Sequence, residues 1–300
     1  MNDTITRDEP DSFVAYTEPV KSVVFSNSGR YLATGHTDVT VRLWIEDHLH
    51  LEIDPRSHDE KIRPTEMVRS IAFSPDESRI FIAASDTINA YSTADGELLW
   101  QYRPPRHFGF LIVSPQSIAV SRDGQMAASF NYGSMARLDL DGNIIFRRSE
   151  NYAPTKLGFS PQGKAIVGAD SFNLCVWNAE DGSFAHRWPV KNKIYALAVA
   201  PNEPLVVTRE LHTLSLWDID EFAELCELPS GRGLPTVAFS PRDRLIASGE
   251  RHRVRLINLE CKGVRDLDAG DASVLNITFT PDGNQLVAGC SDGRVRRWSI

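Results

Sequence analysis

The stretch that decides the fold is DGRVRRWSI (residues 292–300). A polar Asp-Gly turn leads into a run typical of a β-strand, with Trp298 two residues before the end. No turn and no further strand follow this run in the sequence. Because an open sheet edge exposes unpaired backbone donors and acceptors, we expect the partner of this strand to come from elsewhere in the chain.

The same pattern recurs along the whole sequence. VKSVVFSNSGRYLATGHTDVTVRLW (20–44) and VLNITFTPDGNQLVAGCSDGRVRRW (274–298) align residue by residue, and seven such units are found. In one series of apolar positions the successive separations are 48, 47, 39, 40, 40 and 40 residues. A period in this range indicates a repeat architecture. The two series of apolar positions are Phe25, Phe73, Val120, Phe159, Val199, Phe239 and Phe279, and Trp44, Tyr91, Leu138, Trp177, Trp217, Ile257 and Trp298.

Each unit predicts four short strands. A β-branched run such as VVF comes first, and turns such as SPDG or SPQG follow it. A second apolar run ends in small residues, a polar turn leads to a third run such as VRLW, and a DG turn precedes the fourth. Four antiparallel strands in a unit of about 43 residues are typical of a propeller blade.

These units resemble WD40 repeats, and the resemblance covers about residues 12 to 300. Only Trp217-Asp218 is a true WD dipeptide, and the Gly-His that such repeats carry before the first strand is essentially missing. The resemblance therefore implies that the buried His–Ser–Trp–Asp hydrogen-bond networks of the family are incomplete here. The family's turn aspartate is clear at Asp38 and Asp292, near its place at Asp86 and Asp170, and replaced around Tyr132, Leu211 and Arg251.

The sequence thus predicts an all-β, seven-bladed propeller of four-stranded antiparallel blades. In WD40 proteins the first segment commonly supplies the outer strand of the last blade, and SFVAYT (12–17) is the candidate here. We expect a flexible tail over residues 1–11 and a single propeller domain over 12–300. The expected blades lie near 20–53, 68–103, 117–147, 155–189, 193–228, 234–267 and 273–300 plus 12–17.

Composition limits the classes of partner. The formal net charge of −8 gives no general attraction to nucleic acid or to anionic membranes, and no apolar run reaches the roughly 20 residues that cross a bilayer. The start has no apolar signal segment, and the four cysteines are far apart with no CxxC pair. We therefore expect no disulfide framework, no structural zinc, no cofactor, no nucleic-acid or membrane partner, and a cytoplasmic location.

Candidate binding residues follow from the expected geometry. Turns between the second and third strands, and connections between successive blades, share one face of a WD40 propeller, called the top face. Tyr and Arg anchor many protein interfaces. The alternative is that each residue only lines or caps its own blade. The candidates on this face are Arg69, Tyr132, Phe172, Tyr195, Arg209, His212, Arg251 and His252.

Two connections on the same face are long. The first, 54–66, is charged, and the second, 103–116, mixes proline, arginine and large apolar residues. Long loops in compact domains are often functional, so we expect a projecting rim that includes His107, Phe108 and Phe110. The second loop could instead fold back and cover a blade edge, and the first could be a tolerated insertion.

A basic run in the last two units is a candidate anion patch, although salt bridges with nearby Asp243, Glu250, Asp266 and Asp268 are the alternative. His48 and His50 share one strand face and could bind a metal weakly with Asp47 or Glu52, but such a pair is more often a solvated face. The basic run consists of Arg242, Arg244, Arg251, Arg253, Arg255, Arg265, Arg294, Arg296 and Arg297.

No hydrolase, metalloprotease, P-loop or dinucleotide motif is present. The resemblance therefore implies a non-catalytic protein–protein interaction scaffold that binds a protein or peptide partner, with an acidic partner as a candidate, on its top face. We expect a monomer within a larger complex. The alternatives are a ligand-sensing or regulatory propeller subunit, and a propeller hydrolase or lyase with its site at the channel mouth.

Overall fold

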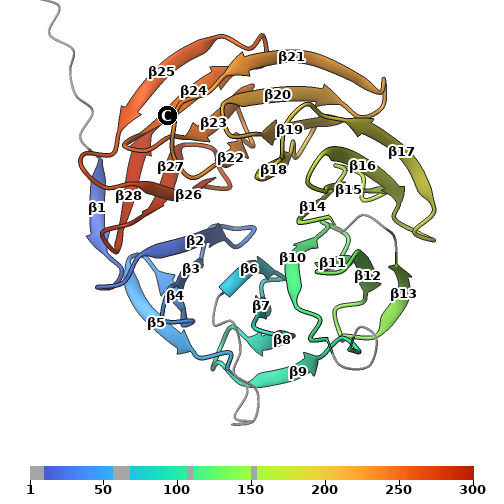
Figure 1. Ribbon diagram of the computed structural model, residues 1–300. Helices are drawn as coiled ribbons and strands as arrows, with labels where there is room; N and C mark the ends of the chain where they lie inside the picture. Colours follow the sequence, from blue (N-terminus) through green and yellow to red (C-terminus); the bar gives the residue numbers. More distant parts are fainter. Residues whose placement is uncertain (1–9, 57–67, 107–110, 150–153) are drawn as a thin grey trace, which may run out of the picture.

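The chain folds as a ring of seven four-stranded antiparallel sheets (Figure 1). The computed structural model describes residues 10–56, 68–106, 111–149 and 154–300. The predicted seven-bladed β-propeller is confirmed. Within the described residues there is no helix with the length and apolar character needed to cross a bilayer.

Blades one to six each use four consecutive strands, with the first strand nearest the centre of the ring. Blades one to three comprise β2 (Val20–Phe25), β3 (Leu32–His36), β4 (Val41–Ile45) and β5 (His48–Ile53); β6 (Val68–Phe73), β7 (Arg79–Ala84), β8 (Thr87–Ser92) and β9 (Leu98–Tyr102); and β10 (Pro115–Val120), β11 (Met126–Phe130), β12 (Ser134–Leu138) and β13 (Ile144–Ser149). Blades four to six comprise β14 (Lys156–Phe159), β15 (Ala165–Ala169), β16 (Asn173–Asn178) and β17 (Phe184–Pro189); β18 (Ala196–Val199), β19 (Leu205–Arg209), β20 (Thr213–Asp218) and β21 (Ala223–Pro229); and β22 (Thr236–Phe239), β23 (Leu245–Gly249), β24 (Arg253–Asn258) and β25 (Gly263–Asp268).

Blade seven joins the two ends of the chain. It consists of β26 (Val274–Phe279), β27 (Gln285–Cys290), β28 (Arg294–Ser299) and, as its outermost strand, β1 (Asp11–Val14). Antiparallel pairing places Phe13 opposite Val295. The strand that the sequence places at 12–17 ends earlier, at Val14, because the next two backbone N–H groups both donate to the Gly293 carbonyl, at 3.0 and 3.1 Å. Gly293 has a φ of 76°, and a Cβ at this position would collide with the Tyr16 carbonyl, so the closing contact requires glycine.

The hydrophobic core is a set of layers between neighbouring blades. Between blades one and two, for example, Ala33, Val41 and Leu43 pack in one cluster with Ile71 and Ile80. Every one of these side chains is almost fully buried. The alternation of apolar residues along each strand therefore fills the spaces between sheets rather than one central core.

A second set of contacts joins the innermost strands around the channel. One position near the start of the first strand is equivalent in all seven blades. Its residue pairs with the last or the penultimate residue of the second strand. Four of these seven residues accept a hydrogen bond from a backbone N–H of the next blade: Ser70 from Ile118 (3.1 Å), Ser117 from Leu157 (3.3 Å), Thr236 from Ile277 (3.3 Å) and Asn276 from Val23 (3.1 Å). The seven positions are Ser22, Ser70, Ser117, Lys156, Ala196, Thr236 and Asn276.

The cysteine spacing argues against a disulfide framework, but the structure contains one disulfide. Cys226 of β21 and Cys261, in the turn before β25, are bonded, with their Cα atoms 6.4 Å apart. They are 35 residues apart, which is close to one repeat, so the stacking of blades five and six brings them together. Cys175 and Cys290 are buried free thiols.

Candidate functional site

Exposed apolar side chains in the connections gather on the top face. On the opposite face, Phe222 is the exposed large apolar residue among the turns that the structure describes. The remaining exposed apolar residues lie on the outermost strands. Tyr16 lies on the top face near blades seven and one. The other exposed apolar residues of this face lie over blades three to six, and we call them the apolar arc: Ile112, Tyr132, Phe172, Tyr195, Leu211 and Leu234.

Three of the predicted aromatic residues belong to this arc. Tyr132, Phe172 and Tyr195 are 47%, 55% and 41% exposed. Tyr132 has a φ of 59°, a left-handed conformation that holds its ring at the tip of the turn between β11 and β12. The ring of Tyr195 lies 5.3 Å from the Lys193 ammonium. The sequence-based candidates do not include Ile112, Leu211 and Leu234. Ile112 and Leu234 precede inner strands, and Leu211 lies in the turn between β19 and β20, so all three are on the top face.

The turns that carry these residues are tied down by backbone hydrogen bonds. The carbonyls of Phe172, His212 and His252 occupy equivalent places 40 residues apart, and each accepts a 2.8 Å bond from the connection that follows its blade. The donors are the N–H groups of Val190, Ser230 and Ala269. Three successive turns are therefore held in one arrangement. The His212 and His252 side chains and that of Arg251 are exposed on this surface.

The sequence places Arg209 on the exposed top face, but this prediction is wrong. Its side chain is fully buried, at 0% exposure. The guanidinium donates from Nη1 to Ser248 Oγ and from Nη2 to the Gly231 carbonyl, both at 2.7 Å, and both acceptors belong to the blade six side of the junction. Through these two hydrogen bonds Arg209 links blade five to blade six.

Arg69 lies at the start of β6, on the innermost strand, and is half-buried. Its Nη1 donates to Gln116 Oε1 of blade three at 3.4 Å. It therefore lies beside the channel and not in the apolar arc. The predicted rim residues His107, Phe108 and Phe110 lie outside the described residues, as does most of the 54–66 connection.

A hollow of about 460 Å³ lies on the top face at blade six. Arg251 and His252 form part of its lining, together with Glu250 and Asp266. Glu250 is bound at its base by Arg253 Nε at 2.7 Å and by the Gly231 N–H at 2.9 Å. The hollow thus has a fixed acidic floor and an exposed basic rim.

The basic run is largely neutralised within the protein. Arg253 and Arg255 both pair with Glu250 and Asp266. The ion-pair alternative accounts for most of the run, so the basic run does not form a continuous anion patch. The other pairs are Arg242–Asp243, Arg244–Glu203, Arg296–Asp292 and Arg297–Asp47.

The candidate metal-binding histidines make other contacts. His48 Nδ1 lies 2.8 Å from the Glu46 carbonyl, and His50 Nε2 lies 3.0 Å from the Thr93 carbonyl. In the part of the chain that the structure describes, no group of three or more His, Cys, Asp or Glu side chains gathers as a metal site would require.

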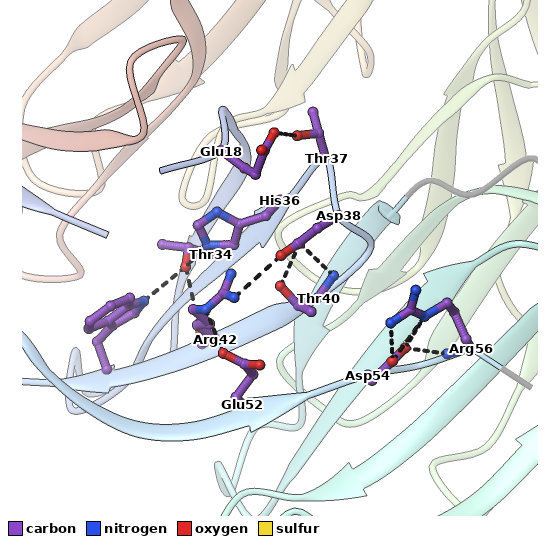
Figure 2. Close-up of polar contacts among 11 residues, drawn as sticks. Glu18, Thr34, His36, Thr37, Asp38, Thr40, Arg42, Glu52, Asp54 and Arg56 are labelled. Atoms are coloured by element: carbon purple, nitrogen blue, oxygen red, sulfur yellow. Dashed lines mark hydrogen bonds and ion pairs between the residues drawn. The ribbon is translucent and has the colours of Figure 1, made fainter. Parts of the chain in front are cut away.

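Blade one contains an extended polar network (Figure 2). Trp44 Nε1 donates to Thr34 Oγ1, and His36 Nε2 lies equally close to that oxygen, each at 2.8 Å. Burial, and next the charge of Arg42, lower the pKa of His36 to about 4. Arg42 is itself held by Glu52 (2.8 Å) and Asp38 (3.4 Å).

Other blades have only fragments of this network. In blade five Trp217 Nε1 donates to Thr208 Oγ1 at 2.9 Å. In blade four the buried Trp177 Nε1 has no hydrogen-bond partner among the described residues. The networks are thus incomplete, as the departures in sequence predict.

Comparison with known families agrees with this architecture. The model of the WD40 family, described as WD domain, G-beta repeat, matches residues 9–44 and 261–299. The first stretch contains β1 to β3 and nearly all of β4, and the second contains β25 to β28. Strands β1 and β26 to β28 form blade seven, where the ring closes. With seven four-stranded blades and closure by the first strand, the chain is a WD40-repeat β-propeller.

Proposed function

We propose that the chain binds a protein or peptide partner across the apolar arc of its top face, over blades three to six. WD40 propellers are generally non-catalytic scaffolds for protein interactions. The observation that carries the proposal is the asymmetry of the described connections, which place six exposed apolar side chains along the arc and one, Phe222, on the opposite face. Exposed apolar residues that cluster on one face mark interaction sites.

The arrangement of the turns supports this use. Tyr132, Phe172 and Tyr195 combine large apolar area with few rotatable bonds, so a partner immobilises little side-chain entropy on binding. The bonds at the Phe172 and His212 carbonyls hold the turns before a partner arrives. The surface is therefore preorganised, which favours affinity.

The apolar arc ends at blade six beside charged and polar side chains. At blade six, Arg251 and His252 bring exposed cationic and polar groups beside the hollow. A partner segment with an apolar stretch followed by a carboxylate would match this order. This favours a peptide of mixed apolar and acidic character.

The test is affinity purification from the native source, with quantitative mass spectrometry, of the unchanged protein and two variants. In the first variant, Phe172→Ser and Tyr195→Ser are combined with Arg251→Glu. The control is Phe222→Ser, which removes an equally exposed aromatic from the opposite face. Circular dichroism and thermal denaturation establish that both variants fold.

We expect the first variant to lose at least one partner that the control retains. Since three candidate anchors are changed, the affinity for that partner should fall by roughly 100-fold or more. Retention of every partner by the folded first variant would contradict the proposal. Equal loss in both variants would also contradict it, because the loss would not depend on the top face.

A further inference from the structure

Two exposed arginines line the hollow at blade six without an acidic partner. Arg232 lies in the connection that precedes β22, and Arg251 lies in the turn between β23 and β24. Both side chains are exposed, and no ion pair joins either of them to a carboxylate in the parts of the chain that the structure describes. Arg253, in the same lining, differs because it is paired with two carboxylates. The hollow therefore presents two unpaired guanidinium groups to solvent.

The backbone holds these two arginines next to each other. The Arg251 N–H donates to the Arg232 carbonyl at 2.7 Å. Gly233 has a φ of 144°, and a Cβ at this position would lie 2.6 Å from the Arg251 nitrogen, so the close approach requires glycine. On the other side of Arg232, the Gly231 carbonyl accepts a 2.7 Å bond from the buried Arg209 guanidinium. The connection and the turn are thus fixed against each other before any ligand binds.

The acidic floor of the hollow is already neutralised. Glu250 and Asp266 each pair with both Arg253 and Arg255, at distances of 2.7 to 3.7 Å. Two carboxylates and two guanidinium groups therefore cancel. An anion that enters the hollow meets no net negative charge from its floor.

The remaining charges leave a positive excess. Arg232 and Arg251 stand at the rim, and the guanidinium of Arg209 lies beneath the same connection. Against these three cations, the described lining has one further carboxylate, that of Asp268, whose Oδ1 accepts the Gly270 N–H at 2.8 Å. The excess is two positive charges, in a chain whose formal net charge is −8. A ligand group with two negative charges would balance it.

We propose that the hollow at blade six binds a phosphate monoester, whose dianion is held between the guanidinium groups of Arg232 and Arg251. A phosphate monoester carries about −1.5 to −2 charges at pH 7, and the planar donors of arginine match its oxygens. A hollow of about 460 Å³ has room for an organic group beside the phosphate, and the buried Leu267 forms part of its lining. The inference goes beyond the docking proposed above, because the hollow can take a phosphate whether or not a partner covers the apolar arc.

The test is isothermal titration calorimetry of the whole chain with phenyl phosphate at fixed ionic strength. Arg232→Gln and Arg251→Gln should each weaken binding by roughly 10-fold, because each removes charged donors to the phosphate. Asp268→Asn should strengthen binding by roughly threefold, because it removes a like charge. The matched control is Arg244→Gln, which removes an exposed, salt-bridged arginine from the opposite face of the same blade and should bind as the unchanged protein does.

Benzoate serves as a probe of similar shape with one negative charge. We expect it to bind at least roughly 10-fold more weakly than phenyl phosphate, since it leaves one positive charge unbalanced and offers fewer acceptors. Equal binding of the two probes would overturn the assignment to phosphate. An equal loss in folded Arg232→Gln and in Arg244→Gln would overturn the site, as would a lack of binding of every phosphate probe by the unchanged protein.

A further comparison separates the two sources of the phosphate. Phenyl phosphate is compared with blocked pentapeptides that carry a central phosphoserine or serine between glycines. Tighter binding of the phosphoserine peptide assigns the phosphate to a protein partner, and tighter binding of phenyl phosphate assigns it to a small molecule. Equal binding of the serine and phosphoserine peptides would overturn the proposal. Phe172→Ser with Tyr195→Ser leaves both arginines in place, so it should keep phosphate binding even where it loses partners.

Discussion

The guanidinium of Arg42 lies over the ring of Tyr16, with its Cζ atom 3.6 Å from the ring centroid. Arg42 belongs to blade one, whereas Tyr16 follows the strand that completes blade seven. Three residues earlier, Phe13 packs against Trp44 of blade one, with ring centroids 5.1 Å apart. The segment that closes the ring is therefore bonded to one blade and packed against the next.

This arrangement predicts that Phe13 stabilises the closure. Phe13→Ala removes the contact with Trp44 and with the Arg297 guanidinium, which lies 5.3 Å from the Phe13 ring. Since the ring is half-buried, we expect a loss of about 1–3 kcal/mol in the free energy of unfolding, measured with urea. The control Val14→Ala, at a side chain 57% exposed, should cost less than about 0.5 kcal/mol. Equal losses would mean that Phe13 does not join the blades.

Arg209 should behave as a buried connector. Arg209→Met leaves Ser248 Oγ and the Gly231 carbonyl without their donor, and we expect a loss of about 2 kcal/mol in unfolding free energy. Arg251→Met, at an exposed arginine of blade six, should change the stability by less than about 0.5 kcal/mol. Chemical denaturation of the two variants side by side decides this. The reverse order of effects would argue against the role assigned to Arg209.

The hydrogen bonds around the channel can be tested at blade three. Ser117 is buried, and its Oγ accepts the Leu157 N–H at 3.3 Å. Ser117→Ala should therefore lower the unfolding free energy by about 1–2 kcal/mol, the typical cost of an unsatisfied buried donor. Ser22→Ala is the matched control, since Ser22 occupies the equivalent position and makes no such bond within the described residues. If both changes have the same effect, the inter-blade bond adds nothing measurable.

His36 should make stability depend on pH. Its pKa is lowered to about 4 in the folded chain, by burial first and Arg42 next, whereas an unfolded histidine has a pKa of about 6.5. Above pH 6.5 neither state binds the proton. As the pH falls from 6.5 toward 4, the unfolded state binds it and the folded state does not, so stability is lost.

At pH 5 this loss should reach about 2 kcal/mol relative to pH 7. The measurement is urea denaturation at several pH values, compared with His36→Gln, in which this contribution to the slope is absent. The charged neighbours Arg42 and Asp38 remain in both proteins, so the difference between the two profiles isolates His36. Parallel profiles would show that His36 does not remain neutral in the fold.

The disulfide between blades five and six makes two countable predictions. Under denaturing conditions, thiol titration of the oxidised protein should find two free thiols, Cys175 and Cys290, and reduction should expose four. Reduction should also lower the unfolding free energy by up to about 4 kcal/mol, because a bridge across 35 residues restricts the unfolded chain. A double variant, Cys226→Ser with Cys261→Ser, should no longer respond to reductant. Four free thiols before reduction would show that the bond does not form.

The seven repeats could be predicted from the sequence alone. The two series, from Phe25 to Phe279 and from Trp44 to Trp298, mark the same strands in every unit. Such strands can be predicted from local sequence, because the alternation of side chains along a strand depends on residues only two apart. Closure was also predictable, since Trp298 needed a partner strand and a strand-like run stood near Val14. The exposed aromatics of the top face followed from their places in the turns.

What the tertiary structure decided lies at the junctions between blades. Whether Arg209 faces solvent or the protein depends on Ser248, which is 39 residues away in the sequence. The disulfide likewise joins cysteines that are 35 residues apart. A local pattern states which residues form a strand, but the environment of a side chain between sheets is set by neighbours that only the closed ring brings together.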